Sequence, residues 1–250
     1  MTQTNTNCKI IVITSGKGGV GKTTTTANIG AGLAMKGYKV ALIDTDTGLR
    51  NLDLLLGLEN RIMYDLVDVT SGKIPYKKAL VRHKKYETLF LLPTSQTKDK
   101  LAVSPEQVVA LCSEMSADFD FILIDCPAGI EQGFKTAVAA ADIALVVTMP
   151  EISAVRDADK IIGELNRADK ENILLIVNRI RPDMVAKGEM LDLDDINDIL
   201  AIKCIGQIPD DEMVVSSTNR GEPVIANTKS QAGIAYQNIT RRLCVKMFHL

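Results

Sequence analysis

The chain has 250 residues, of which 46 % are hydrophobic and 4 % aromatic, and it carries 29 Lys plus Arg against 31 Asp plus Glu. This balance of charge argues against a generally basic nucleic-acid-binding protein, and the lack of Trp suits a core of Ile, Leu, Val and Ala, as in parallel sheets. The five Cys residues are scattered without a C-x-x-C pair. The sequence therefore indicates neither a zinc site nor a disulfide framework, and we expect reduced thiols in a cytoplasmic protein.

The sequence predicts a short lead-in followed by a single domain. Residues 1–8 are polar and lack the apolar region of a secretory signal, so we expect a disordered lead-in. No run approaches 18 consecutive apolar residues, as a membrane-spanning helix would need. Strands then alternate with helices, without a Gly/Ser-rich linker or a repeat. This pattern predicts a single α/β domain over 9–240, with a doubly wound, mostly parallel sheet flanked by helices.

A glycine-rich loop follows the apolar run 10–13 and precedes a helical pattern over 24–35. It fits G-x-x-x-x-G-K-[ST] over 16–23. Its glycines let backbone N–H groups surround phosphate oxygens at the helix N-terminus, Lys22 reaches the β- and γ-phosphates, and Thr23 binds Mg²⁺. The predicted phosphate-binding residues are Gly18, Gly19, Val20, Gly21, Lys22, Thr23 and Thr24.

The same stretch contains G-x-G-x-x-G from Gly16, and Asp44 ends the next strand at about the spacing of a dinucleotide site. The Lys-Thr pair that closes the loop favours the phosphate-loop interpretation. A dinucleotide-binding loop has no use for a Lys-Thr pair aimed at a terminal phosphate and a metal.

An acidic loop follows the second predicted strand, 38–44, and leaves the carboxyl edge of the sheet, where α/β proteins bind ligands. Asp44, Asp46 and Asp53 would repel a triphosphate unless a cation or a water-orienting role intervenes. Asp46 is the candidate for orienting the attacking water or holding Mg²⁺ through water. The alternative is that these are solvated loop acids.

Residues 58–105 are the least regular part of the sequence and include a basic stretch over 73–85. We interpret that stretch as a solvated face, because few aromatic residues are interleaved for base stacking. A strand is predicted at 89–92, and a helix begins at Pro105 and ends near residue 117.

The apolar strand 119–125 ends in Asp125, and a Pro and a Gly then turn the chain sharply. Phosphate-loop enzymes place a carboxylate near their metal in this way. Many buried strands end in Asp, but the combination with the loop at 16–23 makes Asp125 a candidate metal-supporting residue.

Two later strands end in residues suited to a base. Strand 173–177 is followed by Asn178 and Arg179, and strand 204–208 by the turn Pro209-Asp210-Asp211. An Asn amide matches the donor and acceptor of an adenine edge, although an ordinary turn residue is an equal alternative. A further strand at 143–148 and a helix at 152–168 complete the alternation.

The C-terminal segment has Tyr236, Ile239 and Leu243 at helical spacing, with basic residues at the edge of that stripe. We expect the first half of this amphipathic helix to pack on the core. The basic and apolar end, 241–250, is expected to make a weak contact with an anionic membrane.

Together these residues resemble the ParA/MinD family of ATPases. Lys17 directly after the first glycine is similar to the deviant phosphate loop of that family, and 44–57 resembles the first switch region of its branch that places the division septum in bacteria and plastids. Further matches, at 92–100, 125–131, 155–159 and 219–224, extend the resemblance over nearly the whole chain.

The resemblance implies a P-loop ATPase that uses ATP and Mg²⁺ and forms a homodimer with ATP. Lys17 would reach the partner subunit's phosphates, Lys22 would bind in cis, and Asp46 would position the water. Thr23 would bind the metal and Asp125 would support it. Adenine would be held by Asn178, Arg179, Pro209 and Asp211.

The resemblance also implies a place and partners. The protein would lie in the cytoplasm, peripheral on the cytoplasmic face of the cell membrane, or in the plastid stroma and at the inner envelope if it is plastid-encoded. It would recruit a MinC-like division inhibitor and respond to a MinE-like activator or another topological factor, with no nucleic acid expected. The alternative is a ParA-like DNA-partitioning ATPase. ATP-driven ligase or reductase chemistry finds no supporting residues.

Overall fold

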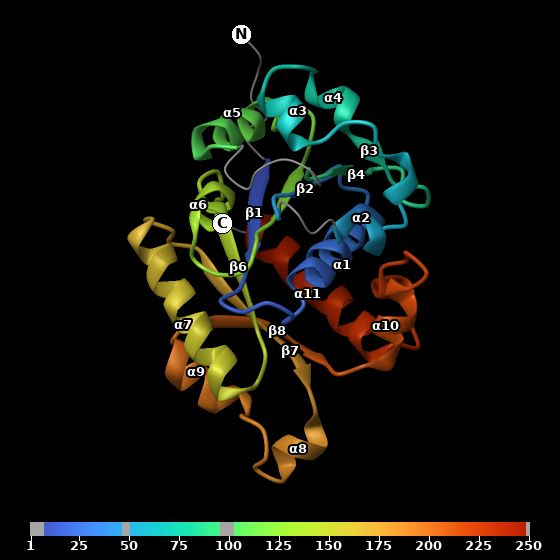
Figure 1. The fold of residues 1–250 in the computed structure, drawn as a ribbon. Helices are drawn as coiled ribbons and strands as arrows, with labels where there is room; N and C mark the ends of the chain where they lie inside the picture. Colours follow the sequence, from blue (N-terminus) through green and yellow to red (C-terminus); the bar gives the residue numbers. More distant parts are fainter. Residues whose placement is uncertain (1–7, 47–50, 96–102, 249–250) are drawn as a thin grey trace.

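The computed structural model describes residues 8–46, 51–95 and 103–248. One eight-stranded sheet runs through it in the order β3-β4-β2-β5-β1-β6-β7-β8 (Figure 1). Every neighbouring pair is parallel except the antiparallel pair β3–β4. The strands are β1 (Lys9–Thr14), β2 (Val40–Asp44), β3 (Val81–Arg82), β4 (Leu89–Leu92), β5 (Phe121–Asp125), β6 (Ile143–Thr148), β7 (Ile173–Ile180) and β8 (Lys203–Pro209). The predicted doubly wound, mostly parallel fold is confirmed.

Helices cover both faces of the sheet. Figure 1 shows α1 and α11 on one face and α5, α6 and α7 on the other. The α-helices are α1 (Lys22–Met35), α2 (Leu52–Leu55), α3 (Leu66–Thr70), α4 (Tyr76–Ala79), α5 (Pro105–Met115), α6 (Gln132–Val138), α7 (Ile152–Arg167), α8 (Pro182–Ala186), α9 (Leu193–Leu200), α10 (Glu212–Thr218) and α11 (Gln231–Phe248). Short 3₁₀ turns are η1 (Glu59–Arg61) and η2 (Val224–Ala226).

Two apolar cores follow from this layering, one for each face. The strands of the sheet's centre are apolar on consecutive positions because both of their faces are covered, and β5 is buried along its whole length. The core between the sheet and the helices α1 and α11 contains Leu42, Ile29 and Tyr236. The core on the opposite face contains Ile43 of the sheet with Val155 and Ile161 of α7. Packing on both faces fixes the strands of the sheet, and so fixes the positions of the residues at their ends.

The C-terminal helix α11 packs on the sheet as predicted for its first half. Tyr236, Ile239 and Leu243 are buried, and a Cβ at Gly206 would lie 2.2 Å from Cγ1 of Ile239. The helix runs without a break past residue 240, the predicted end of the ATPase domain. Of the predicted lead-in over 1–8, residues 1–7 lie outside the described residues, as do residues 249–250. No described helix is long and apolar enough to cross a membrane.

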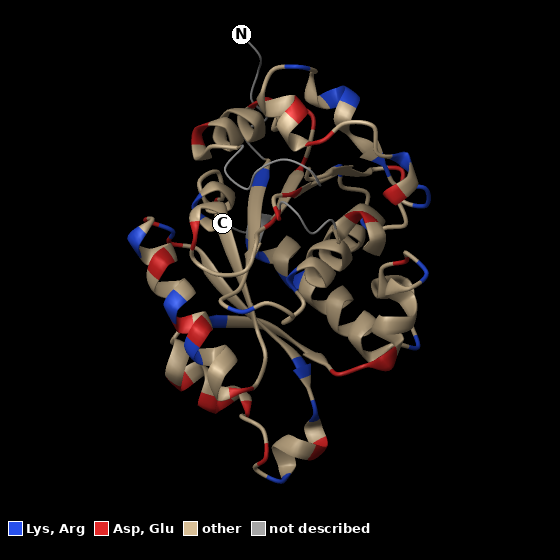
Figure 2. Ribbon diagram, in the orientation of Figure 1, with Lys and Arg blue, Asp and Glu red and all other residues tan. Residues whose placement is uncertain are grey.

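Charged residues lie on the helices and connecting segments around the sheet, with both signs interspersed (Figure 2). In the basic stretch, Lys73 pairs with Asp68 at 3.0 Å and Lys77 with Asp118 at 2.6 Å. These two lysines thus form ion pairs with neighbouring carboxylates at the protein surface. The wider part 58–105 is also more regular than its sequence indicates, because α3, α4 and β3 fall within it. Elements of two to five residues are too short to show a periodic pattern in the sequence.

Candidate nucleotide-binding site

The predicted phosphate loop connects β1 directly to α1. Gly19 and Gly21 have φ of 79° and 98°, in the left-handed region that favours glycine, and Gly21 is the N-cap of α1. Neighbouring elements also exclude side chains here. A Cβ would lie 2.3 Å from Nδ2 of Asn178 at Gly21, and 2.2 Å from the carbonyl oxygen of Asp157 at Gly16. The loop is therefore held between β7 and α7 with its N–H groups at the start of a 14-residue helix.

Buried charged groups gather beside this loop at the carboxyl ends of β2 and β5. Asp44 and Asp125 are register partners on these adjacent parallel strands, and both are almost fully buried. Lys22, the first residue of α1, is 8 % exposed and interacts electrostatically with Asp125. The oxygen Oδ1 of Asp125 accepts a hydrogen bond of 2.9 Å from Oγ1 of Thr26, and Thr23 donates a second bond to the carboxylate.

Burial raises the pKa of both carboxyl groups. The pKa of Asp125 rises to about 6, although Thr23, Thr26 and Lys22 oppose the shift. Burial and the neighbouring Asp125 raise the pKa of Asp44, whose Oδ1 accepts from the backbone N–H of Asp46 at 2.9 Å. A cation placed beside these carboxylates would favour their ionised forms.

These donors fit Mg²⁺ in one specific way. Among the described residues, no three or more His, Cys, Asp or Glu side chains are disposed to hold a metal by themselves. Mg²⁺, however, is typically bound by one or two protein oxygens together with substrate phosphates and water. The Thr23 hydroxyl and the Asp125 carboxylate are hard oxygen donors of that kind, adjacent to the phosphate loop.

Lys17 lies on the outer side of the loop, with 42 % of its side chain exposed. Its Nζ is 3.5 Å from Oγ of Ser153 and 3.9 Å from Oε2 of Glu151, at the start of α7. The two lysines of the loop therefore differ in setting: Lys22 is enclosed by its own subunit, and Lys17 rests on the surface.

The predicted adenine-binding residues lie on the other side of the loop. Strand β7 continues to Ile180 through a register shift, so Asn178 and Arg179 are in the strand and not after it. The Asn178 amide is buried; Nδ2 donates to the Val20 carbonyl at 2.8 Å, and Oδ1 accepts from the Arg179 N–H at 2.9 Å. Arg179 itself is exposed and has φ of 56°. The structure thus ties Asn178 to the phosphate loop, and its contact with adenine stays a prediction.

The turn after β8 is fixed by Asp211. Its carboxylate accepts hydrogen bonds from Oγ of Ser230 at 2.6 Å and from the N–H groups of Met213 and Ala232. Burial raises its pKa, but these hydrogen bonds outweigh that effect and hold the pKa below the ordinary value. Asp211 therefore positions the turn that begins at Pro209, with its charge directed into the protein.

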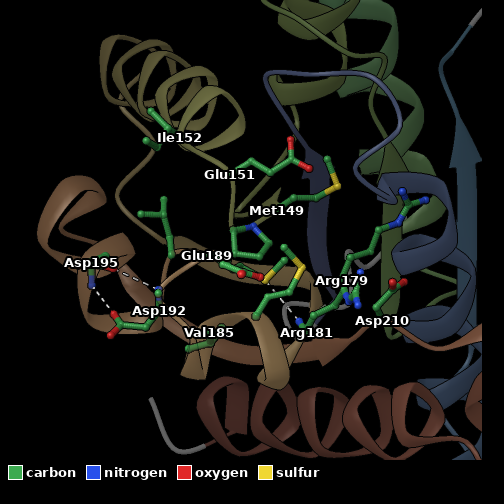
Figure 3. Close-up of a pocket in the computed structure, with 15 residues that line it drawn as sticks. Met149, Glu151, Ile152, Arg179, Arg181, Val185, Glu189, Asp192, Asp195 and Asp210 are labelled. Atoms are coloured by element: carbon green, nitrogen blue, oxygen red, sulfur yellow. Dashed lines mark hydrogen bonds between the residues drawn. The ribbon is translucent and has the colours of Figure 1, made fainter.

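A cavity of about 730 Å³ opens next to the loop (Figure 3). The ends of β6, β7 and β8 and the segment around α8 form its walls. Arg179 and Asp210 border it on one side and Glu151 on another, in the view of Figure 3. Of the predicted adenine-binding residues, Arg179 lines the cavity, whereas Pro209 and Asp211 flank the lining residue Asp210.

Four residues of this region were not selected from the sequence. Thr26 lies one helical turn after Lys22, so helical spacing alone indicates that it faces the same way. Asp44 is the last residue of a parallel strand, which is the signal that selected Asp125. Glu151 comes three residues after the end of β6, as the N-cap of α7, so its position only indicates the same edge of the sheet. Ser153 offers no sequence signal, because its approach to Lys17 depends on how α7 packs.

Comparison with known proteins places the chain among nucleotide-binding domains. The family model described as the CobQ/CobB/MinD/ParA nucleotide binding domain matches residues 11–224. The septum site-determining protein MinD of Bacillus subtilis is 54 % identical over 237 residues, which cover 93 % of this chain and 88 % of that protein. The corresponding Synechocystis protein is 56 % identical over 236 residues, with coverage of 94 % and 89 %.

Solved structures agree with this result. The MinC:MinD cell division protein complex of Aquifex aeolicus matches with a TM-score of 0.89 and 51 % identity over 94 % of this chain and 96 % of that one. MinD of Pyrococcus horikoshii, complexed with Mg-ADP, matches with a TM-score of 0.84 and 29 % identity over 94 % and 96 % of the two chains.

Proposed function

This chain belongs to the CobQ/CobB/MinD/ParA family of nucleotide-binding proteins, and from that premise we propose that it is a Mg-ATP-dependent switch that positions the division septum. The observation that carries the proposal is the pair of lysines in one phosphate loop, Lys22 enclosed and Lys17 exposed. One lysine serves the nucleotide of its own subunit, and the other is free to serve that of a second.

Binding and hydrolysis of ATP would use the enclosed side of the loop. The N–H groups of residues 18–21 and the N-terminus of α1 bind phosphate oxygens, and Lys22 neutralises their charge. Asp46, half-buried beside Asp44, orients the attacking water. Mg²⁺, held by Thr23 and Asp125 together with the phosphates, would supply charge neutralisation. We expect the Asp46→Asn variant to hydrolyse ATP more slowly and to bind ATP with unchanged affinity. Hydrolysis at the wild-type rate would show that Asp46 has no role in the mechanism.

Dimerisation would use the exposed side. In one subunit Lys17 contacts Glu151 and Ser153 at the surface, and such exposed ion pairs contribute about 0–1 kcal/mol. Release of Lys17 toward a partner's phosphates therefore costs little. A bound triphosphate offers it a much stronger charge-assisted hydrogen bond, so ATP acts as the signal for a sandwich dimer.

The dimer would associate with the membrane and recruit a MinC-like division inhibitor, and a MinE-like activator or another topological factor would stimulate release. The identity to MinD proteins and the match to a MinC:MinD complex support the partner. Two weak C-terminal contacts on one dimer act through effective concentration where a single contact is marginal.

Sedimentation with anionic vesicles, with and without ATP, tests the function against the alternative of a ParA-like DNA-partitioning ATPase. We expect ATP-dependent sedimentation with vesicles and no salt-sensitive retention on DNA. A matched truncation should remove residues 245–250 and keep Leu243, because that side chain is buried in the core. ATP-dependent retention on DNA without vesicle binding would favour the alternative.

A further inference from the structure

His83 is a buried side chain with an unused hydrogen-bond donor. It follows β3, is 6 % exposed, and stacks on Tyr86 with ring centroids 4.9 Å apart. Its Nδ1 accepts hydrogen bonds from the backbone N–H groups of Lys85 at 3.0 Å and Tyr86 at 3.1 Å. Two donors at Nδ1 place the proton of the neutral ring on Nε2. That Nε2–H has no partner within the part of the chain that the structure describes.

Such a group calls for an acceptor, because a buried donor without one costs about 1–3 kcal/mol. His83 lines a cavity of about 170 Å³, far above the roughly 10–15 Å³ that one water molecule needs. The cavity lies between the connection from β3 to β4, the residue pair Leu56 and Gly57 after α2, and the segment 220–223. Gly57 and Gly221 line it and approach each other closely, because a Cβ on Gly221 would lie 2.6 Å from Cα of Gly57.

The charge around this cavity is positive. Lys84, Lys85 and Arg220 line it, against the single carboxylate of Glu222. All four of these side chains belong to exposed residues, whereas His83 is buried. A neutral N–H donor surrounded by cations is suited to an anion with several acceptor oxygens.

The cavity is separate from the nucleotide site. Leu89, which accepts from the His83 N–H, pairs in register with Val40 at the amino end of β2, while the phosphate loop lies at the carboxyl ends of the strands. A nucleotide in the loop therefore does not supply the missing acceptor.

We propose that this cavity binds a phosphate-sized oxyanion, which accepts the Nε2–H of His83 and is neutralised by Lys84, Lys85 and Arg220. Burial, followed by Lys85, Lys84 and Arg61, lowers the pKa of His83 to about 4, so the ring is a neutral donor at cellular pH. A bound anion would raise that pKa. The oxyanion is either a free ion or the headgroup of a phospholipid, since both present the same oxygens.

Nitrogen-15 labelling of histidine gives a direct test, because the chain has only two histidines, His83 and His249. We expect His83 to be protonated on Nε2, its resonances to shift saturably with inorganic phosphate at constant ionic strength, and its pKa to rise. His249 is the internal reference. An unshifted His83 at tens of millimolar phosphate, or an equal shift of both histidines, would overturn the site.

Two neighbouring substitutions should act in opposite directions. Arg220→Gln removes a cation and weakens phosphate binding about tenfold, as loss of one charge-assisted hydrogen bond predicts. Glu222→Gln removes the opposing carboxylate and tightens binding. Lys160→Gln, on the exposed surface of α7, is the matched control and leaves binding unchanged. Equal effects of Arg220→Gln and Lys160→Gln would show nonspecific screening and contradict the proposal.

The source of the anion is decided by a second arm with a water-soluble short-chain phosphatidylglycerol. Saturation at a lower concentration than inorganic phosphate assigns the site to a lipid headgroup, and the reverse order assigns it to the free ion. His83→Leu removes the donor; with its fold checked by circular dichroism, and with binding followed by the backbone amide resonances of Lys85 and Tyr86 in uniformly labelled protein, it should show no response to either anion. Retained binding by that variant would overturn the role of His83.

Discussion

The carboxyl edge of the sheet has two halves that are built differently. At the ends of β1, β2 and β5, the charged groups Lys22, Asp44 and Asp125 are 8 %, 2 % and 1 % exposed. At the ends of β6, β7 and β8, Glu151 and Arg179 are exposed beside a wide cavity. Charges on the first half act at low dielectric and are worth more per contact; charges on the second half are screened by solvent. Binding energy should therefore concentrate on the first half.

The largest effect is expected from Lys22→Ala. Removal of a buried cation from the phosphate loop leaves the phosphates without their main protein charge, so ATP should bind at least 100-fold more weakly, about 3 kcal/mol. Nucleotide-induced thermal stabilisation measures the loss. Lys36→Ala, at the exposed C-terminal end of the same helix, is the control, and an equal response of the two variants would contradict the comparison.

Asp125→Asn should stabilise the nucleotide-free protein by on the order of 1–3 kcal/mol at pH 7.5. The pKa of Asp125 is about 6, above the unfolded value of 3.8, so the folded protein prefers the protonated form. The resulting stability is present at low pH and is lost as pH rises through 6. The difference between variant and wild type should vanish near pH 4, and urea unfolding at both values measures it.

Asp125→Asn should also abolish the extra stabilisation that Mg²⁺ gives to the nucleotide complex, because a neutral amide is a poor Mg²⁺ ligand. Removal of Mg²⁺ with a chelator should lower the stability of the wild-type nucleotide complex to that of the variant complex. An equal Mg²⁺ response in both proteins would exclude Asp125 from the metal site.

On the half of the edge at the ends of β6, β7 and β8, Arg179→Ala should weaken ATP binding by no more than about tenfold, since an exposed charge contributes about 1 kcal/mol or less. Arg179→Gly removes the same side chain and relieves the left-handed φ of 56°. Titration calorimetry should therefore give equal affinities for the two variants. A loss as large as that of Lys22→Ala would show that both halves are equally strong.

The smallest effect should come from Glu151→Gln, which removes the surface contact with Lys17. Unfolding free energy should change by less than about 0.5 kcal/mol, as for other exposed pairs. Urea denaturation of variant and wild type measures this. A change of several kcal/mol would mean that Lys17 is held firmly in the free subunit and would weaken its proposed transfer to a partner.

The same contrast explains how much the sequence could predict. The phosphate loop and Asp125 come from local patterns, a glycine loop between strand and helix and an apolar strand that ends in Asp, and the parallel sheet then brings them together. The predicted doubly wound fold rests on the same alternation of strands and helices.

The half of the edge at the ends of β6, β7 and β8 depends on contacts between residues that are far apart in the sequence, which no local pattern encodes. Asn178 and Val20 are 158 residues apart in the chain, and Lys17 and Ser153 are 136 apart. The bulge at Asn178 and Arg179 arises from pairing with β8, so the end of that strand could not be placed from its apolar run. The hydrogen bonds to Nδ1 of His83 likewise come from the backbone N–H groups of Lys85 and Tyr86, and their positions depend on a turn that the residue types do not reveal.

The central claim is that ATP joins two subunits through Lys17, and the mass of the protein in solution tests it most directly. Light scattering should be measured with Mg²⁺ and a non-hydrolysable ATP analogue for wild type, Lys17→Ala and the control Lys36→Ala. We predict dimers for wild type and the control, and folded monomers that still bind nucleotide for Lys17→Ala. A Lys17→Ala protein that dimerises like wild type would contradict the account.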